Sequence, residues 1–268
     1  MSGEHTLASL RPNPHRGITE IRGPYYSSFG PGYLDDLLSV LGDFVDWVKL
    51  PGPAVLLLDD AAIGRYVEVA HRHGAKVSAG GAIEWVLTRG GAAVDHFFDT
   101  IAAQGYDVVE VSAGMLALAD GDYLRLVERA KRTGLHVKAE VGIQFGAGGT
   151  SSAEELARAG TGSVPAAITR ARRALDAGAD TIILESEGVT ESVTQWRTDV
   201  PAAFAEALGL ERLMFEAADP AVFEWYVKNM GPGVNLFIDH SQVLHLESLR
   251  SGVWGPNDLW GRIVTYEA

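Results

Sequence analysis

The segment His136-Val-Lys-Ala-Glu-Val-Gly-Ile-Gln-Phe-Gly-Ala-Gly-Gly149 combines a predicted strand with a glycine-rich loop. Because side chains alternate between the two faces of a strand, Lys138 and Glu140 point to the same face. Charged side chains on an otherwise apolar strand are costly to bury unless they are paired or used. The loop holds four glycines in eight residues, and glycine lets the backbone approach a ligand closely. The pattern is typical of an α/β enzyme's active site, although one salt bridge followed by a flexible loop fits it equally well.

A repeated unit runs through the chain on both sides of this segment. Each copy has an amphipathic helix pattern, a glycine at the helix end, one or two further residues and a short apolar strand. The punctuating glycines are Gly42, Gly74, Gly105, Gly134, Gly178 and Gly209, with Gly231 or Gly233 before the last strand. Their successive spacings up to Gly209 are 32, 31, 29, 44 and 31 residues, which is the regularity of repeated βα units.

These units define eight strands. We predict them at Ile18–Arg22, Phe44–Leu50, Lys76–Ala79, Val108–Ser112, His136–Val141, Thr181–Glu185, Arg212–Glu216 and Val234–Asp239. Eight strands alternating with helices in about 250 residues indicate an α/β protein with the (β/α)8 TIM barrel fold. A doubly wound open sheet is the alternative, but no G-x-G-x-x-G motif follows the first strand.

We expect a single barrel domain over residues 1–268, with 1–16 as an N-terminal extension and 253–268 as a C-terminal tail. The tail contains two tryptophans and is expected to pack on the outside of the barrel or on a neighbouring subunit. The widest glycine spacing contains Gly142–Gly162, which is either a mobile lid or a long surface loop. Within it, Ser151 or Ser152 is predicted to cap a helix that begins at Ala153.

Composition and charge exclude several classes of protein. With 47% hydrophobic and 21% charged residues, the chain can bury a large core and is not disordered. A net charge of −13 argues against nucleic acid or an anionic membrane as a partner. The absence of cysteine excludes disulfides, thiolate chemistry and cysteine-ligated zinc. Without a signal peptide or a long apolar run, we expect a soluble cytoplasmic protein, and a homo-oligomer as its assembly.

Most predicted strands end in ionisable side chains. These are Glu20 and Arg22, Lys49, Glu110, Lys138 and Glu140, Glu185 and Glu187, Glu216, and Asp239 with His240. In a barrel the C-terminal strand ends meet at one mouth, so these groups converge and carboxylates outnumber bases. Clustered carboxylates need a cation or raised pKa values, and hard oxygen ligands suit Mg²⁺ or Mn²⁺ better than zinc. Some of them are expected to pair with Lys49, Lys138 and Arg22 instead, and His240 fits a structural role better than proton transfer.

At these strand ends the sequence resembles the phosphosulfolactate synthase family, from about Arg16 to Gly255. The matching stretches are Tyr33-Leu-Asp-Asp-Leu-Leu38, Gly42-Asp-Phe-Val-Asp-Trp-Val-Lys49, Gly80-Gly81, Val109-Glu-Val-Ser112, Ala139-Glu-Val-Gly142, Ile183-Leu-Glu185, Met214-Phe-Glu-Ala217, Val234-Asn-Leu236, and Leu246-Glu-Ser-Leu-Arg250 with Gly252. Glu20-Ile-Arg-Gly-Pro-Tyr-Tyr26, Glu140-Val-Gly-Ile-Gln-Phe-Gly146 and Ile238-Asp-His-Ser241 are closer to a bacterial, fungal and plant branch. That branch includes the plant heat-stress-associated protein.

The resemblance implies a lyase on a (β/α)8 barrel. The archaeal enzymes catalyse the Mg²⁺-dependent addition of sulfite to phosphoenolpyruvate, forming the carbon–sulfur bond of phosphosulfolactate. Such chemistry needs a metal that stabilises an enolate-like intermediate, cations for the anionic groups and an acid that protonates carbon. The implied metal ligands are Glu110, Glu140, Glu185 and Glu216. The implied catalytic residues are Lys49, Lys138 and Glu140, and the implied substrate-binding residues are Arg22, Gly80, Gly81, Ser112, Gln144 and Ser241.

The chain departs from the archaeal pattern at three basic positions. It has Arg22-Gly-Pro in place of Asp-Lys-Gly, Ile143-Gln144 in place of a pair of lysines, and Ser186-Glu187 where an arginine follows the sixth strand. One of the lost residues is the family's candidate proton donor. Each missing cation leaves charge on a doubly anionic substrate uncompensated. Arg22 is the candidate replacement for the first position.

Lys138 is the candidate replacement for the second position, acting from inside the barrel, and an ion pair with Glu140 or Glu110 is the alternative reading. Three functions remain open. The chain is a phosphosulfolactate synthase, a diverged metal-dependent enzyme acting through an enolate on another small anionic substrate, or a non-catalytic stress-related protein. The first two predict a metal and a ligand in the mouth, and the third predicts neither.

Overall fold

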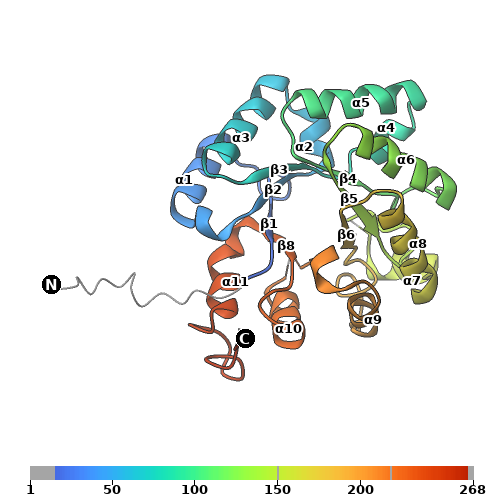
Figure 1. Cartoon of the computed structure of the whole chain (residues 1–268). Helices are drawn as coiled ribbons and strands as arrows, with labels where there is room; N and C mark the ends of the chain where they lie inside the picture. Colours follow the sequence, from blue (N-terminus) through green and yellow to red (C-terminus); the bar gives the residue numbers. More distant parts are fainter. Residues whose placement is uncertain (1–15, 150, 218, 265–268) are drawn as a thin grey trace.

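In the computed structural model, which describes residues 16–149, 151–217 and 219–264, eight parallel strands close into a barrel in chain order. The last strand pairs with the first, in the register that places Thr19 beside Leu236 and Arg22 beside Asp239. Helices surround the ring of strands (Figure 1). The prediction of a single-domain (β/α)8 barrel is confirmed.

The strands lie close to their predicted positions. They are β1 (Thr19–Arg22), β2 (Trp47–Leu50), β3 (Lys76–Ala79), β4 (Val108–Val111), β5 (His136–Val141), β6 (Thr181–Leu184), β7 (Leu213–Glu216) and β8 (Leu236–Asp239). Strand β2 begins later than predicted because Gly42–Phe44 forms the 3₁₀ helix η2. Strand β8 begins later because the Asn235 side chain bridges its neighbours, accepting from Ile18 N and donating to Leu213 O.

Each helix of the outer ring has thirteen residues or fewer. The α-helices are α1 (Pro31–Leu41), α2 (Gly52–Leu57), α3 (Asp60–Arg72), α4 (Ile83–Leu87), α5 (Gly91–Ala103), α6 (Asp120–Arg132), α7 (Ala153–Ala159), α8 (Val164–Asp176), α9 (Asp199–Leu208), α10 (Pro220–Met230) and α11 (Val243–Arg250), with 3₁₀ helices η3 (Leu210–Arg212) and η4 (His240–Gln242). Ser152 caps α7 as predicted, through a capping box with Glu155. The widest glycine spacing therefore contains a helix, and its function as a lid stays a prediction.

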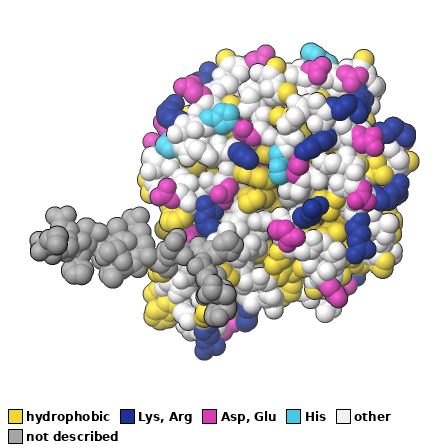
Figure 2. All heavy atoms as spheres, in the orientation of Figure 1, with side chains coloured by type: hydrophobic (Ala, Val, Ile, Leu, Met, Phe, Trp, Pro, Cys, Tyr) yellow, Lys and Arg dark blue, Asp and Glu magenta, His cyan; other side chains and the backbone are white. Residues whose placement is uncertain are grey.

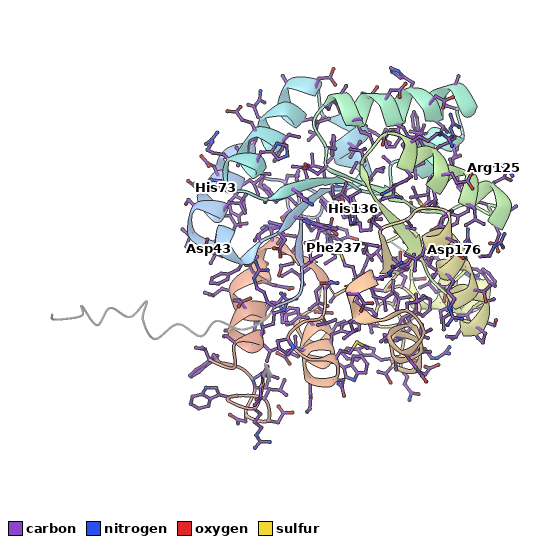
Figure 3. All side chains as sticks on the ribbon, viewed as in Figure 1. Asp43, His73, Arg125, His136, Asp176 and Phe237 are labelled. Atoms are coloured by element: carbon purple, nitrogen blue, oxygen red, sulfur yellow. The ribbon has the colours of Figure 1, made fainter. Side chains whose placement is uncertain are left out.

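The barrel interior is filled in layers. Trp47, Val108, Ile183, Met214 and Phe237 form a small apolar cluster of their own, apart from the core between strands and helices. Figure 3 shows Phe237 within the ring of strands, whereas Asp43, His73, Arg125 and Asp176 lie at the periphery. Because residues two apart share a strand face, the next inward layer toward the C-terminal ends is the charged one. It contains Lys49, Glu110, Glu185 and Glu216, two residues beyond Trp47, Val108, Ile183 and Met214.

The ends of the chain pack against the barrel where they are described. Of the predicted extension, only Arg16 is described, and its guanidinium binds Asp46 at 2.6 Å. In the C-terminal tail, Leu259 is buried in the main core and Ile263 packs against it, which confirms packing on the outside of the barrel. Trp254 and Trp260 contact each other with ring centroids 5.1 Å apart and stay exposed.

Charged side chains of both signs are interspersed over the face shown in Figure 2. The acidic excess of the sequence is therefore not gathered into one patch on that face. No helix in the described ranges has the length and apolar character that crossing a bilayer requires.

Candidate active site at the barrel mouth

Two lysines and three glutamates form a buried ion network inside the barrel. Lys138 on β5 binds Glu20 on β1, and its Nζ lies 3.2 Å from Glu110 Oε2. Lys49 on β2 lies 2.7 Å from the same Glu110 oxygen and 3.4 Å from Glu216 Oε1. Glu110 therefore joins the two lysines. The alternative reading of Lys138 as an ion-pair partner of Glu110 matches this geometry, with Glu20 as its second partner.

In this network, ion pairing shifts the pKa values more strongly than burial does. Burial alone raises the pKa of the Glu110 carboxyl, but Lys49 and Lys138 lower that pKa to about 2. Burial alone lowers the pKa of Lys49, but Glu110 and Glu216 raise it above its ordinary value. The Gly81 N–H also donates to Glu110 Oε1 at 3.0 Å. Glu110 therefore stays ionised, and the two lysines balance its negative charge.

The pKa values of Glu140 and Glu185 are shifted in the opposite direction, upward. Burial, followed by the neighbouring carboxylates Glu185 and Glu110, raises the pKa of Glu140 well above its ordinary value. Burial and Glu216 do the same to the pKa of Glu185. In the described part of the chain, no lysine or arginine forms an ion pair with either of them. Clustered acids without a metal are expected to have raised pKa values, and the shifts of this pair are in that direction.

A cavity of about 350 Å³ opens above these groups at the C-terminal ends of the strands. Glu110, Glu140, Glu185 and Glu216 all line it, which confirms that the four predicted carboxylates share one mouth. Arg22 and Lys49 are its basic residues. The Arg22 guanidinium lies 5.0 Å from the Tyr26 ring and 5.1 Å from the Phe237 ring, which hold it at the cavity wall.

Loops from three strands meet over this cavity. Glu187, after β6, accepts hydrogen bonds from Gly148 N at 2.7 Å and Gly149 N at 3.0 Å. The Tyr26 hydroxyl, after β1, donates to Gly149 O at 2.8 Å. The glycines of this loop let its backbone approach both partners. From the sequence, Glu187 could be identified only as an acid at a strand end. Its hydrogen bonds to the loop after β5 are seen only in the folded structure.

The predicted substrate-binding residues divide into two groups. Arg22, Gly81 and Ser112 line the mouth cavity, and the buried Ser112 hydroxyl has no hydrogen-bond partner among the described residues. Gly80 lies beside Lys49, and a Cβ at that position would be 2.6 Å from Lys49 Cε. The hydroxyl therefore stays available to a ligand, whereas Gly80 makes room for the lysine.

Gln144, Ser241 and Lys138 lie away from the mouth cavity. The Gln144 amide donates to Leu156 O at 2.9 Å and Gly160 O at 3.0 Å, so it ties the β5 loop together. Ser241 is exposed and donates to its neighbour Asp239 at 2.6 Å. Lys138 is fully buried and is not among the residues that line the cavity. Their predicted roles in binding or catalysis stay predictions, and the geometry favours a structural role for each.

The strand-end pattern also missed two residues. Glu84 on α4 is buried and accepts from the N–H groups of Gly114 and Met115, which shapes the loop after β4. Arg170 on α8 faces a second cavity beside the mouth. Both are on helices, so nothing in a strand-end pattern marks them.

The donor chemistry at the mouth fits a hard divalent cation in part. Glu140 and Glu185 are partly buried carboxylates without a lysine or arginine partner among the described residues, and the Glu216 oxygen that Lys49 does not bind lies 3.5 Å from the Ser186 hydroxyl. Glu110 fits less well because the two lysines and Gly81 already occupy it. As the side chains stand, no three acidic or histidine side chains in the described ranges form a ready metal-binding group. The metal assignment therefore stays a prediction, centred on Glu140 and Glu185.

Comparison with known proteins agrees with this architecture. The family model for (2R)-phospho-3-sulfolactate synthase (ComA) matches residues 10–256. The chain is 34% identical over 244 residues to Protein HEAT-STRESS-ASSOCIATED 32 of Arabidopsis thaliana, covering 87% of this chain and 85% of that protein. It is 25% identical over 256 residues to phosphosulfolactate synthase of Methanocaldococcus jannaschii, covering 92% and 95%. A putative fructose-1,6-bisphosphate aldolase from Coccidioides immitis shares the fold, with a TM-score of 0.59 at 15% identity over 93% of this chain and 86% of that one.

Proposed function

The chain belongs to the (2R)-phospho-3-sulfolactate synthase family, and on that premise we propose that its mouth is the active site of a metal-dependent lyase. The proposed reaction is the addition of sulfite, or a related nucleophile, to phosphoenolpyruvate, which forms a carbon–sulfur bond. One observation supports it most: Glu140 and Glu185 are partly buried carboxylates without a basic ion-pair partner among the described residues, and they line a cavity together with Arg22 and Lys49. Buried like charges of this kind are typical of sites that bind a cation.

Glu140 and Glu185 are the proposed ligands of Mg²⁺ or Mn²⁺, with Glu216 Oε2, which accepts a 3.5 Å hydrogen bond from the Ser186 hydroxyl, as a third donor. Such an ion would supply positive charge where an enolate oxygen becomes negative. Lys49 pairs with both Glu110 and Glu216 and so holds these two carboxylates in place at the mouth. The chain therefore provides a site with fixed geometry around the reacting atoms.

The remaining groups of the mouth are proposed to orient the substrate. Arg22, held against two aromatic rings, presents a cation to a carboxylate or phosphoryl group. Ser112 offers an unused hydroxyl. Tyr25 and Tyr26 line the cavity and, through the Tyr26 bond to Gly149, help to exclude water from it.

A second candidate function is an enolate reaction on a less highly charged acid. The observation that favours it is the small number of cations: among the described residues that line the mouth, only Arg22 and Lys49 are basic. Lys49 is already paired with two glutamates. Phosphoenolpyruvate together with sulfite brings more negative charge than Arg22 and one divalent ion neutralise. A non-catalytic protein is the third possibility and predicts neither metal nor ligand binding.

Calorimetry and a product assay by mass spectrometry distinguish these functions. We expect Mg²⁺ to bind at millimolar concentration or below, and phosphoenolpyruvate to bind only when Mg²⁺ is present. Incubation with sulfite should then yield phosphosulfolactate, detected by mass spectrometry. Metal-dependent binding of other small carboxylates without turnover of phosphoenolpyruvate supports the second candidate. No heat of Mg²⁺ binding, with or without phosphoenolpyruvate, contradicts both enzymatic functions.

The raised pKa values predict a pH dependence of stability. In chelator, the folded state retains protons on Glu140 and Glu185 that the unfolded chain releases above the ordinary glutamate value. Their stabilising protonation is therefore present at low pH and is lost as pH rises through the raised pKa values. Glu110, with a pKa of about 2, stays ionised throughout this range and does not contribute to the slope.

We expect the thermal midpoint in chelator to fall as pH rises above the ordinary glutamate value and through the raised pKa values of Glu140 and Glu185. Mg²⁺ at a hundred times its Kd should restore roughly 2.7 kcal/mol at the upper end of this pH range. Differential scanning calorimetry at several pH values measures both effects. A midpoint that is equally pH-dependent with and without Mg²⁺ would show that these carboxylates do not hold the ion.

A further inference from the structure

A second cavity, of about 730 Å³, adjoins the mouth between the loop after β4, the loop after β5 and the first turns of α8. The two cavities share Met115, Glu140, Ala147 and Glu185 as walls. The carboxylates of the proposed metal site therefore face both spaces. A substrate bound to them has room to extend into the larger one.

The larger cavity is apolar apart from a few charged groups. Leu116, Leu118, Ile143 and Phe145 line it, and Phe145 and Met115 are exposed at its opening. Arg170 is the one basic residue among the described residues that line it. An apolar wall with a single cation is the usual composition of a site that binds an amphiphilic small molecule.

The Arg170 guanidinium is held in a fixed position. Its Cζ lies 4.2 Å from the ring centroid of Tyr123. Tyr123 is fully buried, and its hydroxyl donates to the backbone oxygen of Glu140 at 2.8 Å. The arginine is therefore stacked on a ring that is itself tied to the strand carrying Glu140.

Stacking on Tyr123 leaves the donors of Arg170 unused. Its Nε and Nη2 are buried and have no hydrogen-bond partner among the described residues. Its nearest carboxylate is Asp120, with Oδ1 3.5 Å from Nε. Asp120 is half exposed and also lies 3.4 Å from Arg173, so it is a weak partner for both. Buried guanidinium donors without partners are costly. The Arg170 side chain as a whole is 27% exposed and lines the cavity, so an anion bound there can reach the guanidinium.

We propose that Arg170 binds the carboxylate at the far end of an extended dicarboxylic acid whose reacting end lies at Glu140 and Glu185. This assignment rests on the second candidate function, the enolate reaction on a less highly charged acid, and names its substrate class. The apolar walls take the chain between the two acid groups. Arg170 and Arg173 share the single carboxylate of Asp120, so the three groups carry one net positive charge, which suits a carboxylate better than a doubly charged phosphate.

Calorimetry with matched acids tests the assignment. Dicarboxylates from succinate to suberate are titrated into the full chain in Mg²⁺, each beside the monocarboxylate of the same length, from butyrate to octanoate. We expect the longer dicarboxylates to bind about tenfold to a hundredfold more tightly than their partners, the usual value of a charged hydrogen bond. In Arg170→Met this preference should disappear.

Arg173→Met is the matched control, because it removes a guanidinium from the same helix and the same Asp120 but not from the cavity. It should keep the preference, and Arg170→Lys should keep part of it. Equal binding of both acid series by the unmodified protein overturns the assignment, whether or not the variants fold. So does a preference that survives Arg170→Met. A preference for dicarboxylates that does not depend on Mg²⁺ supports the role of Arg170. It contradicts only the proposed metal site.

Discussion

Lys138→Met is expected to lower the free energy of unfolding by about 3–5 kcal/mol, the cost of removing one partner from a buried ion pair. Lys138 and Glu20 are both 0% exposed, and Glu20 has no other lysine or arginine partner in the described ranges. Met keeps the approximate length of the side chain but leaves the Glu20 carboxyl buried and unpaired. Glu110 is less affected because Lys49 remains 2.7 Å away. Chemical denaturation with urea measures the change.

The double variant Lys138→Met with Glu20→Gln separates charge from packing. Because it removes the orphaned carboxylate, it should recover more than half of the lost stability, and the exposed Lys76→Met should change stability by less than about 0.5 kcal/mol. If Lys138→Met is as stable as the unmodified chain, the pair contributes nothing to the fold. The double variant also tests catalysis: a proton donor at Lys138 would make turnover fall at least about a hundredfold even in this folded background. Since Lys138 does not line the mouth, we expect turnover within about tenfold.

Glu140→Gln is expected to have opposite effects on binding and on stability. In Mg²⁺ binding it should weaken affinity by about a hundredfold or more, because one charge at contact distance is worth several kcal/mol. Turnover of the physiological substrate should fall by a similar factor. In chelator the variant should be more stable than the unmodified chain above the raised pKa of Glu140, because burial and Glu185 disfavour the ionised Glu140. A gain in stability with a loss of function is the signature of a strained functional site.

Glu247→Gln is the matched control for this experiment. Glu247 is also buried, and burial also raises its pKa, but it lies on α11 near Arg250, which binds Thr19 and Val234 at the N-terminal ends of the strands. The Glu247→Gln substitution should leave Mg²⁺ affinity unchanged. Unchanged Mg²⁺ affinity in Glu140→Gln would remove Glu140 from the metal site and leave Glu185 and Glu216 as the candidates.

The sequence was sufficient to predict which charged side chains enter the barrel. The alternation of strand residues places Glu110, Glu140, Glu185 and Glu216 on the inner face, and the glycine spacing places all four at the same end. It could not predict their depth or their partners. Lys138 pairs with Glu20 from β1, across the barrel, and that contact depends on the stagger of strands rather than on any local pattern.

Residues outside the strands were harder to predict. Gln144 stands where a family lysine would act, yet its amide donates to the Leu156 and Gly160 carbonyls of its own loop, in addition to the backbone donors of those carbonyls. Arg170 is on the helix pattern of α8, where an arginine normally points to solvent. Only the position of Tyr123 beneath it shows that this arginine faces a cavity.

Gly80 has a consequence for how this sequence can change over time. Its backbone dihedrals do not demand glycine, but even one methyl group there would meet the stem of Lys49 at 2.6 Å. Substitutions at the two positions are therefore not independent: alanine at position 80 becomes tolerable only after position 49 has a shorter or differently placed side chain. A chain that lost Lys49 would in turn free Glu110 and Glu216 from their common partner. Relatives in which position 80 carries a side chain should therefore have a mouth with a different balance of charge.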